Sequence, residues 1–245
     1  MKNNVFISIA SAIAIIATAT VNCTGCSAQA TATQTPTATQ GTQTDQPTAH
    51  PALMDPSKAT EQAPAKFRAK FNTTKGDITI EVTRVWAPNG ADRFYNMCKI
   101  GYFQDIAIFR AVKGFMFQFG IHGDPAVSAK WAVAPIKDDP HMGVPNNPGT
   151  LSFAQTGRPN SRGVQMFVNL GPNTFLDKPQ RGGGSPFVPF GKVVEGMDVV
   201  NKINTEYGEN ARDVQGNFQT QGNAYIKQKY PNIDFIKSVT IIEVK

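Results

Sequence analysis

The feature that most constrains the fold of this 245-residue chain is a series of short apolar runs after Ala65, each bounded by Gly, Pro or Asn. The runs are rich in Phe, Val and Ile and are about five to eight residues long, which is typical of β-strands. Only two stretches show a helical period, so a parallel sheet with crossover helices is not favoured. We therefore predict a mainly β fold, a closed antiparallel barrel that leaves no exposed strand edge.

Turn and cap residues place the elements along the chain. Strand-like sequence on both sides of Lys75-Gly76 predicts a hairpin. Pro88 and Asn89 open a helical period that Gly101 ends, and GMDVVNKINTEYG predicts a second helix. The stretch from His122 to Gly149 is rich in turn residues and predicts no regular element.

The N-terminus has the pattern of an export signal. Lys2 precedes the apolar run VFISIASAIAIIATATV, which is too short and too rich in small residues for a membrane span. The run ends at CTGC, which resembles a bacterial lipoprotein box with Gly25 before an acceptor Cys26. We predict a signal peptide over residues 1–26 and a lipid on Cys26, with cleavage near Ala30 as the alternative. The mature protein would then lie in the periplasm or cell envelope.

Three cysteines, Cys23, Cys26 and Cys98, give no disulfide framework. If Cys23 leaves with the leader and Cys26 carries a lipid, only Cys98 remains in the folded part. Its surroundings predict a small buried helix residue. CTGC could also be a redox or metal pair, but no second Cys or His pair stands near it.

Residues 27–65 are dominated by Thr, Ala, Gln and Pro, with Leu53 and Met54 as the only larger apolar side chains. Such a segment cannot bury enough surface to offset its chain entropy. It is predicted to be a disordered tether between an anchor and a folded domain over residues 66–245. A docking peptide is the alternative.

The formal net charge of +6 comes from basic residues that are scattered along the chain. Because there is no basic run, binding to nucleic acid is not predicted.

Hydrolytic and metal chemistry lack the necessary residues. The chain has three histidines: His50 lies in the predicted tether, and His122 and His141 are expected in solvated loops. Asp138 and Asp139 form an acidic pair expected at the surface, and RGGGSP lacks the Lys-Ser/Thr of a phosphate-binding loop. No metal and no cofactor are predicted.

The segment FRAVKGFMFQFG, residues 109–120, places one guanidinium in an otherwise apolar strand. A guanidinium stays charged in a protein and is costly to bury without a partner. Apolar and amide side chains on nearby runs could converge around it into a small pocket: Phe115, Met116, Gln118, Gln165, Phe167 and Leu176. Ordinary core residues with an Arg110 that reaches solvent are the alternative.

Four motifs in order resemble the cyclophilin family of peptidyl-prolyl cis-trans isomerases. FRAVKGFMFQFG resembles the family's signature strand, and GTLSFAQTG, VQMFVNL and PFGKVVEGMDVVNKI resemble its later blocks. The similarity runs from about Phe67 to Lys245. It implies a closed eight-stranded antiparallel barrel, here with two α-helices as caps, and isomerisation of X-Pro bonds without a cofactor.

The resemblance also assigns the site residue by residue. It puts the catalytic arginine at Arg110 and, beside it, Gln118, which holds the substrate backbone. The other substrate-binding positions are Phe115, Met116, Ala154, Gln155, Gln165, Phe167, Phe175, Leu176 and Phe187. Ala154 is expected to contact the peptide through its backbone.

Three positions depart from the family pattern. Phe175 stands where the family has a tryptophan, Phe187 where it has a pocket histidine, and Phe119 where it has a glycine. The first change argues against tight cyclosporin binding. The segments 121–149 and 208–230 also differ from the short form of the family.

The expected function is therefore isomerisation of X-Pro bonds in exported proteins by a monomer, which assists their folding. The expected partners are proline-containing peptides and unfolded exported proteins. The alternative is a non-enzymatic proline-peptide binding or chaperone module, which we would favour if Phe175 and Phe187 closed the groove. An assay on an X-Pro peptide separates the two.

Overall fold

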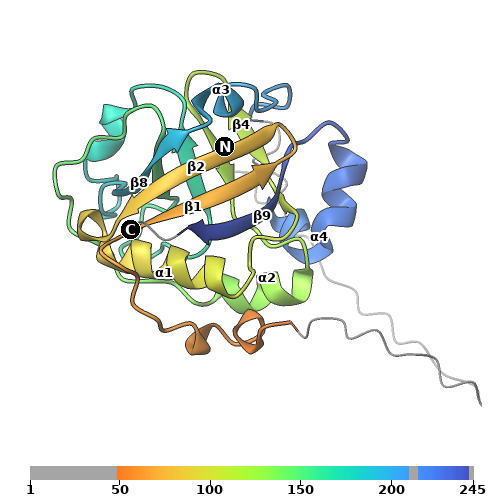
Figure 1. Cartoon of the computed structure of the whole chain (residues 1–245), viewed down its shortest axis with the longest axis horizontal. Coiled ribbons are helices and arrows are strands. Elements are labelled where there is room, and N and C mark those ends of the chain that lie inside the picture. Colours follow the sequence, from red (N-terminus) through yellow and green to blue (C-terminus); the bar gives the residue numbers. More distant parts are fainter. Residues whose placement is uncertain (1–48, 210–214, 243–245) are drawn as a thin grey trace, which may run out of the picture. The chain divides into compact units, whose positions relative to one another are not determined.

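The computed structural model describes residues 49–209 and 215–242. The predicted leader, the lipidation site Cys26 and the tether up to residue 48 lie outside the described residues. All of the elements below lie within these described residues (Figure 1).

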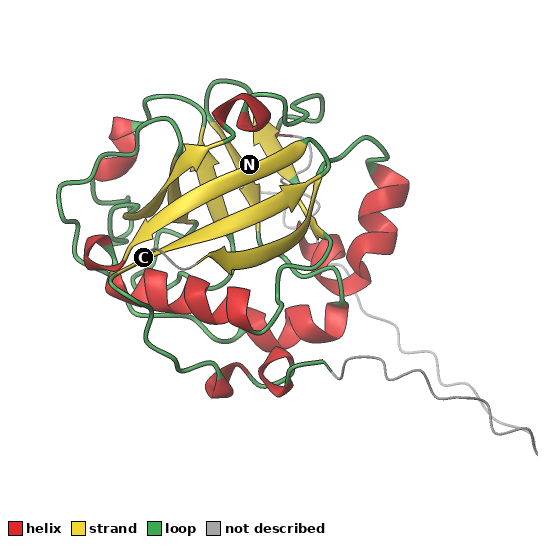
Figure 2. Ribbon diagram, in the orientation of Figure 1, coloured by secondary structure: helices red, strands yellow, loops and turns green. Residues whose placement is uncertain are grey.

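One curled antiparallel sheet organises the domain, with helices outside it (Figure 2). Its strand order is β3-β9-β1-β2-β8-β6-β7-β5-β4. The strands are β1 Lys66–Thr73, β2 Gly76–Thr83, β3 Ile106–Ala107, β4 Arg110–Val112, β5 Met116–Phe119, β6 Thr150–Phe153, β7 Met166–Asn169, β8 Pro189–Glu195 and β9 Phe235–Ile242. The predicted hairpin is β1–β2, and β9 lies between β3 and β1.

The sheet contains nine strands among the described residues, so the expected count of eight is wrong. The difference arises at Ile108 and Phe109, which separate the apolar run of residues 106–112 into β3 and β4. β3 pairs with β9 and β4 pairs with β5, so these two residues connect the two ends of the strand order. The mainly β antiparallel class is confirmed.

The described residues contain four α-helices rather than two: α1 Pro88–Lys99, α2 Pro125–Ala132, α3 Met197–Val200 and α4 Gln215–Lys229. The prediction of α1 is confirmed, but the helix expected over residues 196–208 is a single turn, α3. The sequence missed α2 and α4. Over residues 49–209 and 215–242, no helix is long and apolar enough to span a bilayer.

Helix α4 is kinked at Gly222, and the kink packs α4 against the start of α2. Gly222 has φ +66°, a conformation that suits glycine, and a Cβ there would lie 2.2 Å from the carbonyl oxygen of Gly123. The next residue, Asn223, donates its backbone N–H to the same oxygen (3.0 Å) and its side-chain amide to the carbonyl of Asp105 (2.7 Å). These contacts fix α4 beside α2.

Residues 49–65 pack against the domain, so the predicted C-terminal boundary of the disordered tether is wrong. Ala52 is fully buried, and the indole Nε1 of Trp131 donates to the carbonyl of Leu53 (2.9 Å). Further along, the N–H of Glu61 donates to the side chain of Asn96 (2.9 Å). The amino-acid composition did not predict this packing, because the composition argument considers large apolar side chains. The contacts named here are made by backbone groups and a small side chain.

Strand β5 shows how alternation separates the core from the site. Phe117 and Phe119 point into the main core, where Phe119 is fully buried and its ring lies 6.0 Å from that of Phe71. Met116 and Gln118 point to the opposite face, toward the cavity described below. Because successive side chains of a strand alternate, one short segment serves both faces. Phe119, the departure from a family glycine, is therefore a core residue.

Candidate active site

A cavity of about 650 Å³ opens beside strands β5 and β7. That volume lies within the range of small-ligand sites in proteins. Its walls include ten of the eleven residues that the resemblance assigned to the site: Arg110, Phe115, Met116, Gln118, Ala154, Gln155, Gln165, Phe167, Leu176 and Phe187. The eleventh, Phe175, lies beside the cavity.

The apolar side of the cavity is a separate cluster from the main core. Met116, Phe167 and Leu176 are buried together, with Phe115 and Phe187 packed against them. The rings of Phe167 and Phe187 meet edge to face at 5.6 Å. The cluster forms an apolar depression in the cavity wall.

Arg110 lies at the edge of this depression with 16% of its side chain exposed. Its guanidinium carbon lies 5.7 Å from the centre of the Phe115 ring. Nη1 donates to Oε1 of Gln118 (3.0 Å), while Nε (3.0 Å) and Nη2 donate to the two carboxylate oxygens of Glu209. Since a guanidinium has five N–H groups, these three bonds leave two donors for a substrate.

The amides beside Arg110 form a one-way chain of hydrogen bonds. Gln118 donates from Nε2 to Oε1 of Gln165 (2.7 Å), and Gln165 donates from Nε2 to Oε1 of Gln215 (3.1 Å). Arginine can only donate, so Gln118 must present its oxygen to Arg110, and this choice fixes the orientation of every amide that follows. The site is therefore polar along one edge and ordered by its arginine.

Ala154 and Gln155 continue the wall after β6. The N–H of Ala154 already donates to the carbonyl of Gln165 (2.9 Å), so a backbone contact between Ala154 and a peptide would have to use its carbonyl. Gln155 donates its amide to the carbonyl of Ser185.

The two phenylalanines that replace family residues leave the cavity open. Phe175 is 57% exposed, and its ring stacks on Phe115 with the centroids 6.0 Å apart. Phe187 lines the cavity and packs against Phe167. The condition that would favour a closed, non-enzymatic groove is therefore not met.

Comparison with known proteins identifies the family. Residues 68–228 match the family described as cyclophilin type peptidyl-prolyl cis-trans isomerase/CLD. The chain belongs to the cyclophilin family. Its enzymatic activity is accordingly peptidyl-prolyl cis-trans isomerisation.

Bacterial relatives agree with this family, and a solved structure shares the fold. The chain is 36% identical to peptidyl-prolyl cis-trans isomerase B of Escherichia coli (strain K12) over 136 residues, which are 54% of this chain and 81% of that protein. It is 35% identical to a peptidyl-prolyl cis-trans isomerase of Acinetobacter baylyi, over 57% of this chain and 72% of that protein. A cyclophilin crystal structure from Cryptosporidium parvum shares the fold, with a TM-score of 0.52, 19% identity, and coverage of 73% of this chain and 99% of that one.

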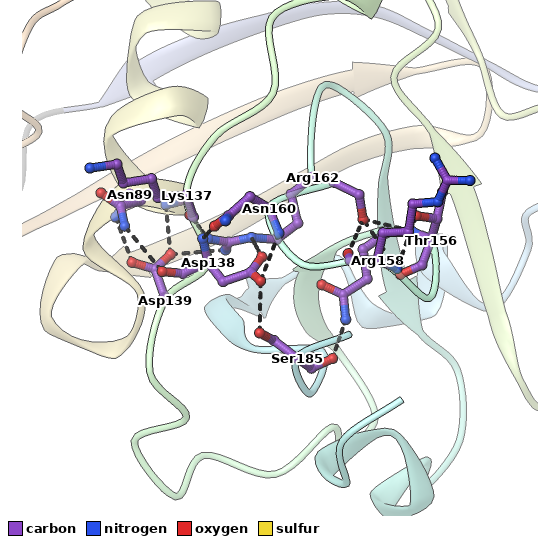
Figure 3. Close-up of polar contacts among 12 residues, drawn as sticks. Asn89, Lys137, Asp138, Asp139, Thr156, Arg158, Asn160, Arg162 and Ser185 are labelled. Atoms are coloured by element: carbon purple, nitrogen blue, oxygen red, sulfur yellow. Dashed lines mark hydrogen bonds and ion pairs between the residues drawn. The ribbon is translucent and has the colours of Figure 1, made fainter. Parts of the chain in front are cut away.

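A buried ionic network holds the loop of residues 155–163, part of which lines the cavity of this cyclophilin (Figure 3). Arg162 is 2% exposed and donates from Nη1 to Oδ2 of Asp139 (2.9 Å), and its Nε lies 3.4 Å from Oδ1 of Asp138. Asp139 also accepts from the N–H groups of Asn89 (2.8 Å) and Gly90 (2.9 Å) in the first turn of α1. A carboxylate at a helix N-terminus is favourably placed.

Asp138 ties two more loops to this network. Its backbone N–H and one carboxylate oxygen exchange hydrogen bonds with Asn160 (both 2.9 Å), and the same oxygen accepts from the hydroxyl of Ser185 (2.8 Å) (Figure 3). The expectation of a surface acidic pair is wrong, because Asp139 is buried against Arg162 and α1. No local sequence pattern could predict the burial of Asp139, since its partners Arg162 and Asn89 lie more than twenty residues away in the sequence.

The expectation that His122 and His141 are solvated is wrong in part. His122 packs edge to face on the ring of Tyr102 at 5.0 Å, and burial lowers its pKa. His141 lies 3.8 Å from a carboxylate oxygen of Asp177. No group of three or more metal-ligating side chains was found among the described residues. Cys98 is buried as predicted, and burial raises its pKa.

The sequence missed the part of the cavity contributed by α2 and α4. Ser128, Trp131 and Ala132 of α2 and Gln215 and Gln219 of α4 line it. Glu209 contacts Arg110 but carries no motif that could have revealed it. The only signal was the departure of segments 121–149 and 208–230 from the short family form.

Proposed function

We propose that this cyclophilin accelerates rotation about X-Pro bonds in exported proteins, with Arg110 as the catalytic donor and the Met116–Phe167–Leu176 depression as the proline site. The observation that carries the proposal is the position of a guanidinium with spare donors at the edge of an apolar depression. In addition, the Cryptosporidium parvum cyclophilin has been crystallised in the presence of the dipeptide Ala-Pro.

The chemistry needs neither a nucleophile nor a proton transfer. Rotation about a prolyl bond is slow because amide resonance must be broken, a barrier of about 18 to 20 kcal/mol. As the bond twists, the proline nitrogen becomes pyramidal and regains a lone pair. A fixed donor such as Arg110 aimed at that nitrogen stabilises the twisted state more than either planar isomer.

The surroundings of Arg110 add to this effect. The apolar cluster excludes water from the proline ring and strengthens the charge-assisted hydrogen bond. Gln118 and Gln165 each retain one amide N–H beyond the bonds described, enough to anchor a peptide backbone on both sides of the rotating bond. One charge-assisted hydrogen bond contributes about 1.5 to 3 kcal/mol, or one to two powers of ten in rate.

The test is isomerase activity of the Arg110→Ala variant on a short X-Pro peptide. We expect kcat/KM to fall at least about tenfold, while the circular dichroism spectrum and Tm stay close to wild type. Lys113→Ala is the matched control, because it removes a nearby exposed positive charge. Full activity of a folded Arg110→Ala protein would contradict the proposal, whereas peptide binding by an inactive wild-type chain would support a non-enzymatic binding module.

We also propose export and a lipid anchor at Cys26, on the strength of Lys2, the apolar run after it and the CTGC sequence. The mass of the mature N-terminus tests both. We expect the mature protein to begin with a diacylglyceryl-modified Cys26, and we expect the mass of this modification to be absent in Cys26→Ala. A free N-terminus near Ala30 would instead show that the protein is secreted without a lipid anchor.

A further inference from the structure

Glu209 is the acidic partner of the catalytic arginine, and neither the sequence motifs nor the family blocks include it. It binds the edge of the guanidinium formed by Nε and Nη2 through both carboxylate oxygens. Such two-point pairing fixes the plane of a guanidinium as well as its position. We propose that Glu209 is a positioning residue that orients Arg110 for catalysis.

The backbone places Glu209 opposite Arg110. Gly208 forms an antiparallel bridge with Ala111, the second residue of β4. In an antiparallel arrangement, the residue before Ala111 lies opposite the residue after Gly208, so this bridge brings Glu209 beside Arg110. The contact thus follows from main-chain pairing as well as from side-chain attraction.

The chain just before Glu209 is held in place. The ring of Tyr207 packs edge to face on Tyr230 at 4.9 Å, and its hydroxyl accepts from the N–H of Asn232 (3.1 Å). Asn204 donates its N–H to the buried carboxylate of Asp234 (2.6 Å). These contacts fix residues 204–207 to the residues around the start of β9. The backbone that carries the Glu209 carboxylate is therefore held in position.

The series of amide hydrogen bonds that starts at Arg110 ends at Gln215, six residues after Glu209 in the sequence. Gln215, the first residue of α4, accepts from Gln165, while Glu209 accepts from Arg110. The donors run from Arg110 through Gln118 and Gln165, and their terminal acceptors are Glu209 and Gln215. Both acceptors orient residues that the proposed mechanism uses, and neither is part of the apolar proline site.

Glu209 could instead block the arginine, but the hydrogen-bond count argues against it. Glu209 uses two of the five guanidinium N–H groups and Gln118 uses one, so two remain available for the proline site. Orientation, rather than inhibition, is therefore the role that we assign to Glu209.

The test compares Glu209→Gln and Glu209→Ala in the full chain with the control Glu206→Gln. Glu206 is exposed and lies three residues earlier, and among the described residues its carboxylate accepts two long hydrogen bonds, from the side chains of Asn204 and Asn232 (both 3.4 Å). Its replacement by Gln changes the net charge by the same amount as Glu209→Gln. We expect kcat to fall about tenfold in Glu209→Gln and further in Glu209→Ala, with KM within about twofold. Glu206→Gln should match wild type.

A double variant separates positioning from a general structural effect. If Glu209 acts through Arg110, then Arg110→Ala/Glu209→Gln should be no slower than Arg110→Ala alone. Wild-type or higher kcat in Glu209→Gln would overturn the proposal, and so would an additive loss in the double variant. The inference rests on Arg110 as catalytic donor, so a normal rate in Arg110→Ala would refute that assignment instead.

The arginine side chain offers a measurement that does not depend on turnover. In ¹⁵N-labelled wild-type protein, the Nε–H of Arg110 should exchange slowly with solvent, and Glu209→Gln should speed that exchange. Assignment of the resonance uses its absence in Arg110→Ala. Rapid exchange in the wild-type protein would show an arginine that Glu209 does not hold, and would overturn the inference.

Discussion

The two sides of the cavity are built in different ways. On one side, β5 and β7 supply Met116, Gln118 and Phe167, and strand alternation alone decides which face each side chain takes. On the other side, irregular chain around residues 155–163 is held by Arg162 and its two aspartates. The strand side is specified by local sequence, and the loop side by contacts between distant segments.

This difference predicts how each side fails when it is mutated. On the strand side, neighbouring residues should have separable effects, because one faces the core and the next faces the cavity. On the loop side, a single buried residue should affect stability and activity together, because the same hydrogen bonds provide both.

The largest effect is expected at β5. Phe119→Ala should lower the free energy of unfolding by about 3 to 5 kcal/mol, because it empties a fully buried ring site. Its kcat/KM should stay within about twofold of wild type when measured well below Tm, since Phe119 points away from the cavity. Gln118→Ala is the neighbouring comparison and should lose about tenfold in kcat/KM. Equal activity losses in the two variants would remove the separation of faces. Urea unfolding and a peptide assay measure the pair.

The buried network should come next. Arg162→Ala leaves Asp139 without its buried ionic partner and should cost about 3 kcal/mol in the free energy of unfolding. We also expect kcat/KM to fall, because the loop with Gln155 loses its support. Arg158→Ala, at an exposed position in the same loop, is the control and should change neither value. A destabilised Arg162→Ala with full activity would show that the network supports the fold but not the site.

A smaller effect is expected at the α4 kink. Gly222→Ala should lower the free energy of unfolding by about 1 to 3 kcal/mol, because its φ is positive and a Cβ would collide with the carbonyl of Gly123. Gly216→Ala, six residues earlier and with open space around it, should be neutral or stabilise by up to about 1 kcal/mol. Thermal and urea unfolding measure the stability of the two variants. Equal free energies of unfolding would show that the kinked conformation does not require glycine at position 222.

The smallest change in stability is expected at Phe175. Since its ring is largely exposed, Phe175→Ala should alter the free energy of unfolding by less than about 0.5 kcal/mol. It should nevertheless raise KM for an X-Pro peptide, because Phe115 loses the ring stacked on it. An unchanged KM would place Phe175 outside the substrate site.

The sequence revealed the strand side well and the loop side poorly. The β1–β2 hairpin, α1 and the alternation in β5 follow from local pattern and turn chemistry. Helix α2 was missed because its Pro125 and the turn residues around it indicated a loop, although Pro125 occupies the first turn and Asp124 caps the helix. The burial of Asp139 depends on Arg162 and α1, which no local pattern connects to it.

The site residues divide in the same manner. Those predicted on β4, β5 and β7 lie in short motifs, and the structure brings them together around one cavity. Glu209 could not be found, since its role depends on a bridge between Gly208 and Ala111, almost one hundred residues apart. The role of a polar residue in a segment without a motif can be inferred only from the residues that it contacts in the structure.

The place of β9 in the sheet sets the order in which the domain can be completed. β9 lies between β3 and β1, and pairs Arg68 near the start of the sheet with Ile242 near the end of the chain. During synthesis, β1 therefore has only β2 beside it until the last strand has left the ribosome. Contacts between such distant residues form slowly. The domain thus stays open, with its aromatic core exposed, until β9 has been made.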